Sequence, residues 1–313
     1  MVTIHHALGT AYGGVGAPVL TGGVDIFFVI SGVMLWTVTA RRPVSPGVFL
    51  RRRVLRIVPM YWMVTSLMAG LLLAAPGLMR TARFDPAHVA ASYLFIPWPH
   101  PPPETGIYPL LIPGWTLNYE MAFSALFGLA LAAPARTRGA IILGTLAALA
   151  AVGLAWPDLP VIPHFYTAPI VLEFALGIAI AMVAARVRAP WLAVGLAVAG
   201  WVALAASASV EPAGLERLLR LGVPAAAIVA GTVLWERARG MTLLPAGVLV
   251  GNASYAAYLT HTIVLAMLAM AWRRAGLPGQ PVAFIVLGVA ASLAVALAVH
   301  VAFERRLAAW LLR

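Results

Sequence analysis

Apolar residues form long continuous runs along the chain, and short gaps rich in arginine, proline and glycine separate the runs. Most runs approach the roughly 20 residues that a helix needs to cross the hydrocarbon core of a bilayer. Because apolar and polar residues do not alternate, the runs predict helices rather than the strands of a membrane barrel. Nine spans are predicted, at residues 24–40, 54–75, 114–133, 139–156, 168–185, 190–208, 218–235, 248–271 and 282–302.

The gaps between the runs contain residues that end helices, in the stretches RRPVSPG, AAPAR, WPDLPVIP, VRAP and RAGLPGQP. The sequence has no repeat of fixed period and no linker long enough to separate domains. It therefore predicts an all-α fold, a polytopic transmembrane helical bundle, with residues 1–313 forming a single integral-membrane domain.

Composition excludes a water-soluble domain. Of the 313 residues, 62% are hydrophobic and only 10% are charged, with a mean hydropathy of +0.94, whereas about a quarter of the residues in a soluble domain are charged. The absence of cysteine excludes disulfides, thiolate nucleophiles and cysteine-based metal sites. The first residues, MVTIHHALG, lack the features of a signal peptide, and we expect them to be the last turns of a helix that begins upstream.

All 21 basic residues are arginine, and they gather in alternate gaps. Fifteen fall on one predicted side, namely Arg41, Arg42, Arg51, Arg52, Arg53, Arg56, Arg136, Arg138, Arg186, Arg188, Arg237, Arg239, Arg305, Arg306 and Arg313. The other six are Arg80, Arg83, Arg217, Arg220, Arg273 and Arg274. The positive-inside rule makes the richer side cytoplasmic, so we expect a bacterial cytoplasmic (inner) membrane protein with its C-terminus in the cytoplasm and residues 7–22 and 76–113 outside. Nucleic acid is not an expected partner, because the arginines do not form one soluble face.

Polar groups inside such a chain are candidates for chemistry, since an ionised group at a helix centre costs about 2.5–3.5 kcal/mol. They are His6, Asp25, Ser31, Asn118, Glu120, Glu173, Asn252, Ser254, Tyr255, Tyr258, His261, His300 and Glu304. Ser254 and Tyr258 are four residues apart, and Tyr258 and His261 three, so these groups share one helix face.

Structural roles remain open for several of these groups. Asp25 lies near a helix start, where a carboxylate also serves the helix dipole. Glu173 has the alternative of a packing ion pair with an arginine. For Ser254 and Tyr255 the structural alternative is a hydrogen bond between helices, and for His300 it is a packing role in the helix interface.

The stretch FLRRRVLRIVP differs from ordinary flanking charge. Arg52, Arg53 and Arg56 fall within about one helical turn, so their guanidinium groups are able to converge on one anion, and arginine suits bidentate contact with phosphate. The alternative is a role in membrane topology and lipid headgroup contact.

Five stretches together resemble the acyltransferase 3 family of integral-membrane acyltransferases, especially its exopolysaccharide O-acetyltransferase-like members. They are GGVDIFFVISGVMLW (22–36), FLRRRVLRIVPMYW (49–62), PGWTLNYEMAFSALFGLAL (113–131), VLEFALGIAIA (171–181) and LVGNASYAAYLTH (249–261). The resemblance implies about ten transmembrane helices, an acyl-CoA (acetyl-CoA) donor from the cytoplasm, no metal, and a carbohydrate or lipid-linked glycan acceptor. It also implies a motif of Arg, ten residues, then His, which places the presumed catalytic histidine on His6, with the motif's Arg falling before Met1.

The chemistry of acyl transfer assigns roles to the remaining candidates. His6 is the expected base, with an acetyl-imidazole intermediate as the other route. Asp25 would orient the His6 ring or a substrate hydroxyl, and Glu120, beside Trp115 and Tyr119, would bind the acceptor sugar. Arg52, Arg53 and Arg56 would hold the coenzyme phosphates, and Ser254, Tyr258 and His261 would line the donor channel.

Two other functions fit the same residues. Intramembrane carboxylates and histidines also form proton relays in proton-coupled transporters. A catalytically inactive relative that packs within an envelope assembly is the third alternative.

Overall fold

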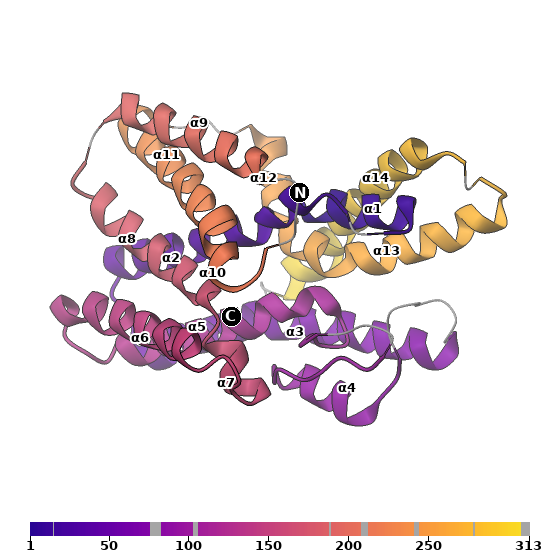
Figure 1. Ribbon diagram of the computed structural model, residues 1–313, viewed down its shortest axis with the longest axis horizontal. Helices are drawn as coiled ribbons and strands as arrows, with labels where there is room; N and C mark the ends of the chain where they lie inside the picture. Colours follow the sequence, from indigo (N-terminus) through magenta and orange to yellow (C-terminus); the bar gives the residue numbers. More distant parts are fainter. Residues whose placement is uncertain are drawn as a thin grey trace. The chain divides into compact units, whose positions relative to one another are not determined.

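The computed structural model describes residues 1–14, 16–75, 83–102, 106–187, 189–207, 212–240, 244–277 and 279–307. Within these ranges the chain is helical and has no strand beyond one isolated bridge, Pro99 to Ile107. The all-α prediction is confirmed (Figure 1). The helices are α1 Val2–Tyr12, α2 Gly22–Arg41, α3 Pro46–Ala74, α4 Pro86–Tyr93, α5 Trp115–Ala130, α6 Ala135–Ala155, α7 Val161–Tyr166, α8 Leu172–Ala184, α9 Pro190–Ala206, α10 Gly214–Arg217, α11 Val223–Arg239, α12 Pro245–Asn252, α13 Ser254–Arg274 and α14 Pro281–Val299.

Each of the nine predicted spans coincides with helix, and six helices in the described ranges are long and apolar enough to cross a membrane. These are Pro18–Arg41, Pro46–Ala74, Ala135–Ala155, Gly214–Arg239, Ser254–Arg274 and Pro281–Leu307. Two further apolar helices, Pro169–Ala184 and Pro190–Ala206, are shorter. The predicted span 248–271 is interrupted, because α12 ends at Asn252 and α13 begins at Ser254.

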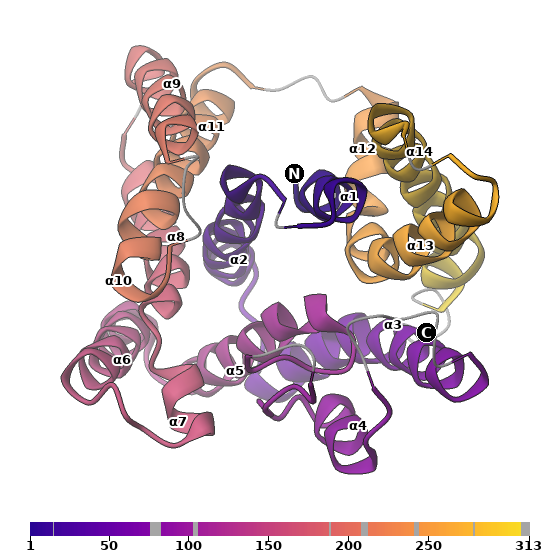
Figure 2. The ribbon, with the colours of Figure 1, turned by 45° about the vertical axis from the view of Figure 1, so that its right-hand side comes forward.

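The chain divides into two compact units. Unit 1 consists of Met1–Ala17, Arg52–Asn118 and Leu243–Arg313, and unit 2 of Pro18–Arg51 and Tyr119–Thr242. In unit 1, α1 packs against α13 and α14, which pack on each other. In unit 2, α9 packs on α11 and α2 on α8 (Figure 2).

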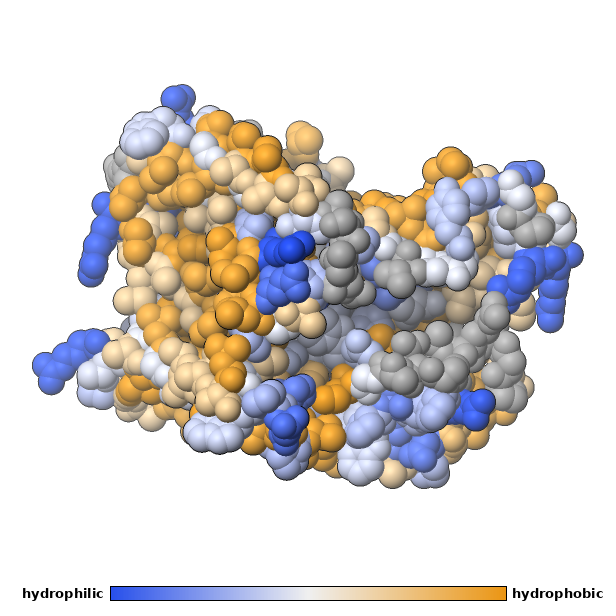
Figure 3. All heavy atoms as spheres, viewed as in Figure 1, coloured by the Kyte–Doolittle hydropathy of each residue, from blue (hydrophilic) through white to orange (hydrophobic). Residues whose placement is uncertain are grey.

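Small residues allow the close crossings of unit 2. A Cβ on Gly177 of α8 would collide with the Val29 carbonyl oxygen of α2, and one on Gly32 of α2 with the Phe174 carbonyl oxygen. Glycine at the crossing lets two backbones approach, which is how helices associate in lipid. Apolar side chains cover much of the surface over α9 and α11 in Figure 3, in line with a lipid-facing surface.

The predicted external loop 76–113 is more than a surface connection over the residues described. Tyr61, Trp62 and Ser66 of α3 bond the Ser92 carbonyl, the Tyr93 carbonyl and the Tyr93 hydroxyl at 3.1, 2.9 and 2.6 Å. These three α3 residues lie near the middle of that 29-residue helix. The end of α4 therefore packs beside the middle of α3, not beyond its end. Such an irregular segment is tolerated at that level where its backbone groups are bonded to protein.

Candidate active site

Two histidines meet in unit 1, one from each end of the sequence. The ring centroids of His6 in α1 and His261 in α13 are 5.1 Å apart. His5 borders the pair, with its ring centroid 5.2 Å from that of His6. The packing of the short α1 against α13 and α14 produces this arrangement. His6, expected to be catalytic, thus neighbours a residue that sequence reasoning assigned to the donor channel.

The hydrogen bonding of His261 determines what its ring offers. Nδ1 lies 3.1 Å from the Ala257 carbonyl oxygen, one helical turn earlier. A carbonyl only accepts, so Nδ1 carries the hydrogen and Nε2 has a free lone pair. The residue is fully buried, and Nε2 has no hydrogen-bond partner in the part of the chain that the structure describes. A buried imidazole nitrogen with an unused lone pair beside a second imidazole is suited to accept a proton.

Tyr258 attaches the start of α5 to this histidine pair. Its hydroxyl donates to the Pro113 carbonyl at 2.8 Å and accepts from the Thr116 hydroxyl at 3.0 Å. Its ring centroid is 6.0 Å from that of His261. Trp115, expected to contact the acceptor, is half-buried at the first position of the same helix. Ser254 is exposed and makes none of these contacts.

The predicted coenzyme-binding arginines lie on α3, because that helix begins at Pro46 rather than near residue 54. Arg52 and Arg56 are exposed and Arg53 is half-buried. Arg53, Arg56 and Glu304 lie near the Tyr255 hydroxyl, which donates to the Ile57 carbonyl at 2.7 Å. A positively charged helix face thus adjoins the beginning of α13.

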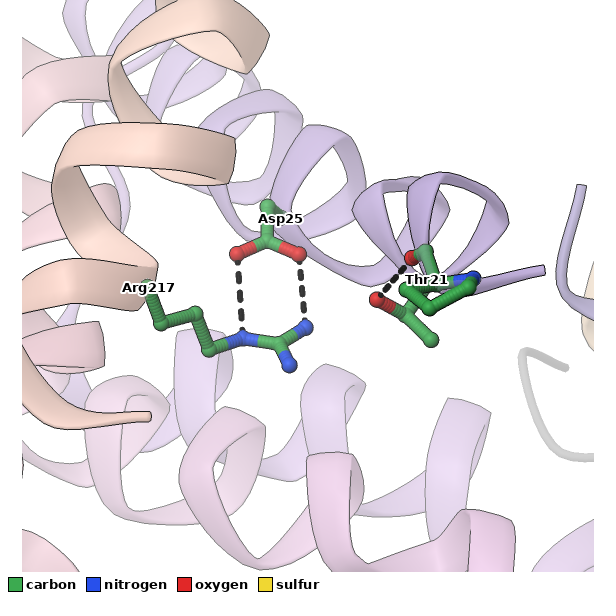
Figure 4. A network of polar contacts seen from close by, with 4 residues as sticks. Thr21, Asp25 and Arg217 are labelled. Carbon is green, nitrogen blue, oxygen red and sulfur yellow. Dashed lines mark hydrogen bonds and ion pairs between the residues drawn. The ribbon is translucent and has the colours of Figure 1, made fainter. Parts of the chain in front are cut away.

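Asp25, the carboxylate in an apolar helix, has an arginine partner in unit 2. Arg217 Nε and Nη2 donate to its two carboxylate oxygens at 3.2 and 2.7 Å, the parallel contacts drawn in Figure 4. The Asp25 side chain is fully buried and that of Arg217 is 13% exposed. Asp25 also lies in the first turn of α2, where the helix dipole favours a negative charge. The proposed role of Asp25 toward an imidazole or a sugar stays a prediction.

A second carboxyl group joins this ion pair. Glu173 in the first turn of α8 is fully buried beside Asp25, and neither of its oxygens receives a hydrogen bond from a described N–H or O–H group. It lies against Gly222, in the π-helical turn Leu218–Gly222 that follows Arg217. A π-turn inserted in a helix often marks a functional position. Two buried carboxyl groups therefore lie near one guanidinium, and that guanidinium is hydrogen-bonded to Asp25.

Tyr119 borders the same cluster, near Arg217 and Glu173. Its hydroxyl donates to the Phe165 carbonyl at 2.6 Å, and its ring stacks on Phe165 at a centroid distance of 4.1 Å. Glu120, the next residue, is only 2% exposed. The structure thus brings Asp25 and Tyr119 together in unit 2, and His6, Tyr258 and His261 together in unit 1.

Comparison with known proteins decides the family. A sequence profile described as "Acyltransferase domain" matches residues 1–301. The chain belongs to this acyltransferase family. It is 38% identical over 264 residues to "Exopolysaccharide production protein ExoZ" of Rhizobium meliloti (strain 1021), an alignment covering 83% of this chain and 80% of that protein. A second relative, "Protein 2 in picA locus" of Rhizobium radiobacter, is 27% identical over 119 residues, covering 33% of this chain and 62% of the relative. No solved structure matches.

The family resemblance read from the sequence is confirmed, and with the apolar helices it makes the chain an integral, multi-pass membrane acyltransferase. A member of this family uses an acyl donor as co-substrate. Among the described residues, no group of three or more His, Asp or Glu side chains is arranged to hold a metal ion.

Sequence reasoning on this acyltransferase missed two features of the site. It did not connect His6 with His261, because the contact joins segments 255 residues apart in the numbering. It also counted Arg217 only as one of six arginines on the outer side. A buried carboxylate does require a cationic partner, but all six arginines were equal candidates before the fold was known.

Proposed function

We propose that this acyltransferase transfers an acyl group, with acetyl as the expected one, from cytoplasmic acyl-CoA to a hydroxyl of a cell-envelope or extracellular carbohydrate. The family match supports the reaction type, and the relative named for exopolysaccharide production supports a polysaccharide acceptor. The observation that carries the proposal is the contact between the half-buried His6 and the fully buried His261, whose Nε2 lone pair is unused among the described residues.

The proposed reaction needs a general base and a site that excludes water. His6 takes the proton of the acceptor hydroxyl as its oxygen attacks the thioester carbonyl, forming a tetrahedral intermediate. The intermediate collapses by breaking the carbon–sulfur bond, and the leaving thiolate takes the proton from the imidazolium. In the alternative route, His6 attacks first and carries the acyl group as acyl-imidazole until the hydroxyl displaces it. In the first route His261 Nε2 accepts a hydrogen bond and takes no proton. In the second route the thiolate leaves when His6 attacks, and His261 Nε2 takes the proton of the hydroxyl that displaces the acyl group and passes it to the thiolate. Burial limits the competing hydrolysis of the thioester.

The donor is proposed to bind at the arginine face of α3. Arg52, Arg53 and Arg56 would hold the coenzyme phosphates, since guanidinium groups bind phosphate in bidentate fashion. Tyr258 and His261, with Ser254 at the start of α13, are proposed to line the path of the acyl thioester. The positive-inside distribution of arginine supports a cytoplasmic donor side and a cytoplasmic C-terminus in a bacterial inner membrane.

The acceptor is proposed to contact Trp115, Tyr119, Glu120 and Asp25. Aromatic rings and carboxylates are the groups that commonly bind the faces and hydroxyls of a pyranose. The buried carboxyl groups and aromatic stacks around Tyr119 support a polar site lined by aromatic residues in unit 2. Residues 1–313 are proposed to act as one domain, in line with a family match that extends over both units.

The test uses the full chain in nanodiscs with labelled acetyl-CoA. Slow thioester hydrolysis, and transfer when an oligosaccharide of the exopolysaccharide is added, are expected for the unchanged protein. Both activities should disappear in His6→Ala and fall about a hundredfold in His261→Ala, the low end of the contribution of a group that takes part in general acid–base catalysis.

His164→Ala is the matched control, because that histidine is exposed and belongs to the other unit. Full activity in folded His6→Ala would contradict the assignment of the base. Substrate-dependent proton flux in proteoliposomes without any acyl transfer would instead support the transporter alternative. Coenzyme binding without turnover in any form would support an inactive relative.

A further inference from the structure

Two more histidines lie together in unit 1, away from the residues assigned above. His88 belongs to α4 and His100 to the segment that follows it, and their ring centroids are 4.9 Å apart with the ring planes at 76°. Their side chains are 0% and 5% exposed. The proposed acyl transfer gives this pair no role.

Local structure holds both rings in place. Asp85 caps α4 by accepting a hydrogen bond from the His88 backbone N–H at 2.7 Å. The His100 N–H donates to the Gly106 carbonyl at 2.8 Å, next to the bridge between Pro99 and Ile107. One turn beyond His88, the Ser92 hydroxyl accepts from the Leu110 N–H at 2.8 Å. Hydrogen bonds therefore hold α4 and the segment that carries His100 in defined positions.

Each ring has its hydrogen on a nitrogen that faces a carbonyl. His88 Nε2 lies 2.8 Å from the Tyr108 carbonyl oxygen, and His100 Nδ1 lies 2.9 Å from that of Pro101. Since a carbonyl only accepts, these two nitrogens are the N–H groups. His88 Nδ1 and His100 Nε2 are then both acceptors, and both are buried without a partner among the described residues. Because the two rings are neighbours, one electron-pair acceptor bound between them would satisfy both nitrogens.

We propose that His88 Nδ1 and His100 Nε2 bind one divalent transition-metal ion of the zinc type. Histidines that ligate metals donate their other ring N–H to a carbonyl or carboxylate, and both rings do so here. Zinc–nitrogen bonds of about 2.0–2.1 Å at a tetrahedral angle place two imidazole centroids about 5.2 Å apart, close to the 4.9 Å found.

The hydrogen bonding of the two rings suits a metal ion. A neutral imidazole is the form that ligates metals, and the contacts of His88 Nε2 and His100 Nδ1 with carbonyl oxygens leave one unprotonated nitrogen on each ring. Within the described ranges no third His, Asp or Glu joins the pair, so the proposal names these two imidazoles as its ligands. Affinity should therefore be lower than in sites with three or four protein ligands. The ion would connect α4 to residues 99–102, and so stabilise the part of the chain that precedes Pro113 and its contact with Tyr258. This proposal is independent of the proposed acyl transfer.

The experiment uses the full chain in detergent after removal of metals with a chelator. Zn²⁺ binding is measured by calorimetry, and Co²⁺ serves as a spectroscopic probe of tetrahedral nitrogen ligands. One equivalent should bind and raise the unfolding temperature. His88→Gln and His100→Gln should each weaken binding more than about 100-fold, since even a second-shell partner is worth ten- to a hundredfold. His164→Gln, which changes an exposed histidine, should bind as the unchanged protein does.

A measurement on the unchanged protein covers the case in which a variant misfolds. Diethyl pyrocarbonate labelling, read by mass spectrometry, should be slowed at His88 and His100 by Zn²⁺ and unaffected at His164. Binding that persists in both glutamine variants would overturn the proposal. So would binding that is lost in His6→Ala or His261→Ala and kept in the His88 and His100 variants, because the ion would then belong to the other pair.

Discussion

The buried cluster of Asp25, Glu173 and Arg217 predicts the order of stability of variants at these three positions. Replacing Arg217 by Met leaves two buried carboxyl groups with no cation. Removing one partner of a buried ion pair typically costs about 3–5 kcal/mol, and the uncompensated second carboxyl places Arg217→Met at the upper end. Asp25→Asn is milder, because the fully buried Glu173 lies beside Asp25 and is able to take over the guanidinium. We expect it to cost about 1.5–3 kcal/mol, the value of one hydrogen bond to a charged group.

Glu173→Gln provides the sharper part of this test. Neither Glu173 oxygen receives a hydrogen bond from a described N–H or O–H group, and the carboxyl lies against that of Asp25, so the substitution removes a second acidic group beside Asp25. It should leave the free energy of unfolding unchanged or raise it by about 0.5–1 kcal/mol. The double variant Asp25→Asn with Arg217→Met should recover part of the loss of Arg217→Met, since both charges disappear together.

The assay is reversible unfolding in mixed detergent, followed by circular dichroism and by tryptophan fluorescence at one fixed pH. The expected order of stability is Arg217→Met lowest, then Asp25→Asn, then the unchanged protein, with Glu173→Gln equal or higher. Equal losses in Arg217→Met and Asp25→Asn would refute the view that Glu173 is a reserve partner. A loss above about 1 kcal/mol in Glu173→Gln would refute the view that its carboxyl group has no stabilising contact.

Three further predictions concern packing and binding. Gly177→Ala should destabilise by about 1–3 kcal/mol through collision at the α2–α8 crossing, whereas Gly195→Ala, which meets open space on α9, should be neutral or stabilising in the same unfolding assay. Joint replacement of Arg53 and Arg56 by Gln should weaken coenzyme binding, measured by calorimetry. Arg186→Gln, which changes an exposed arginine outside the cluster, should leave the affinity unchanged. Equal coenzyme affinity in the two variants would contradict the assignment of the donor site. Tyr258→Phe should lower the free energy of unfolding by about 1–2 kcal/mol, because Pro113 and Thr116 lose their contacts with the hydroxyl. It should also lower activity more than Tyr93→Phe, which removes an exposed hydroxyl that contacts Ser66.

The helical architecture was predictable because one physical signal dominates it. A continuous apolar run in this chain has no stable alternative to a helix in lipid, and Pro or Gly marks most helix ends. Helix α3 begins at Pro46, eight residues before the apolar span predicted at 54–75. Its first turns carry Arg51, Arg52 and Arg53, which hydropathy assigns to a gap although arginine is a good helix former. Hydropathy also joined α12 to α13, because Ala253 is itself apolar.

The partners of polar side chains were less predictable. Helix periodicity placed Tyr258 and His261 on one face, and the structure brings their rings near each other. It gives no information on which helix lies opposite, so neither the contact of His261 with His6 nor that of Asp25 with Arg217 followed from it. The segment that holds His88 and His100 was read as an external loop, because proline and histidine interrupt its hydropathy. Its burial depends on tertiary hydrogen bonds such as that between Tyr61 and Ser92.

Polar groups in this chain are of two kinds, and the difference indicates where function lies. Thr260 and Ser292 are buried but donate to the carbonyl four residues earlier, at 2.8 and 2.7 Å, so their helices satisfy them locally. His261 Nε2 and both Glu173 oxygens are equally buried and have no such local solution. Leaving a buried acceptor without a donor costs about 1–3 kcal/mol, which an apolar side chain at the same position would avoid. Of these two residues, only His261 lies beside a second imidazole. Removing its unused lone pair should therefore lower activity without lowering the free energy of unfolding. We expect His261→Leu to be at least as stable as the unchanged protein and to have lower activity.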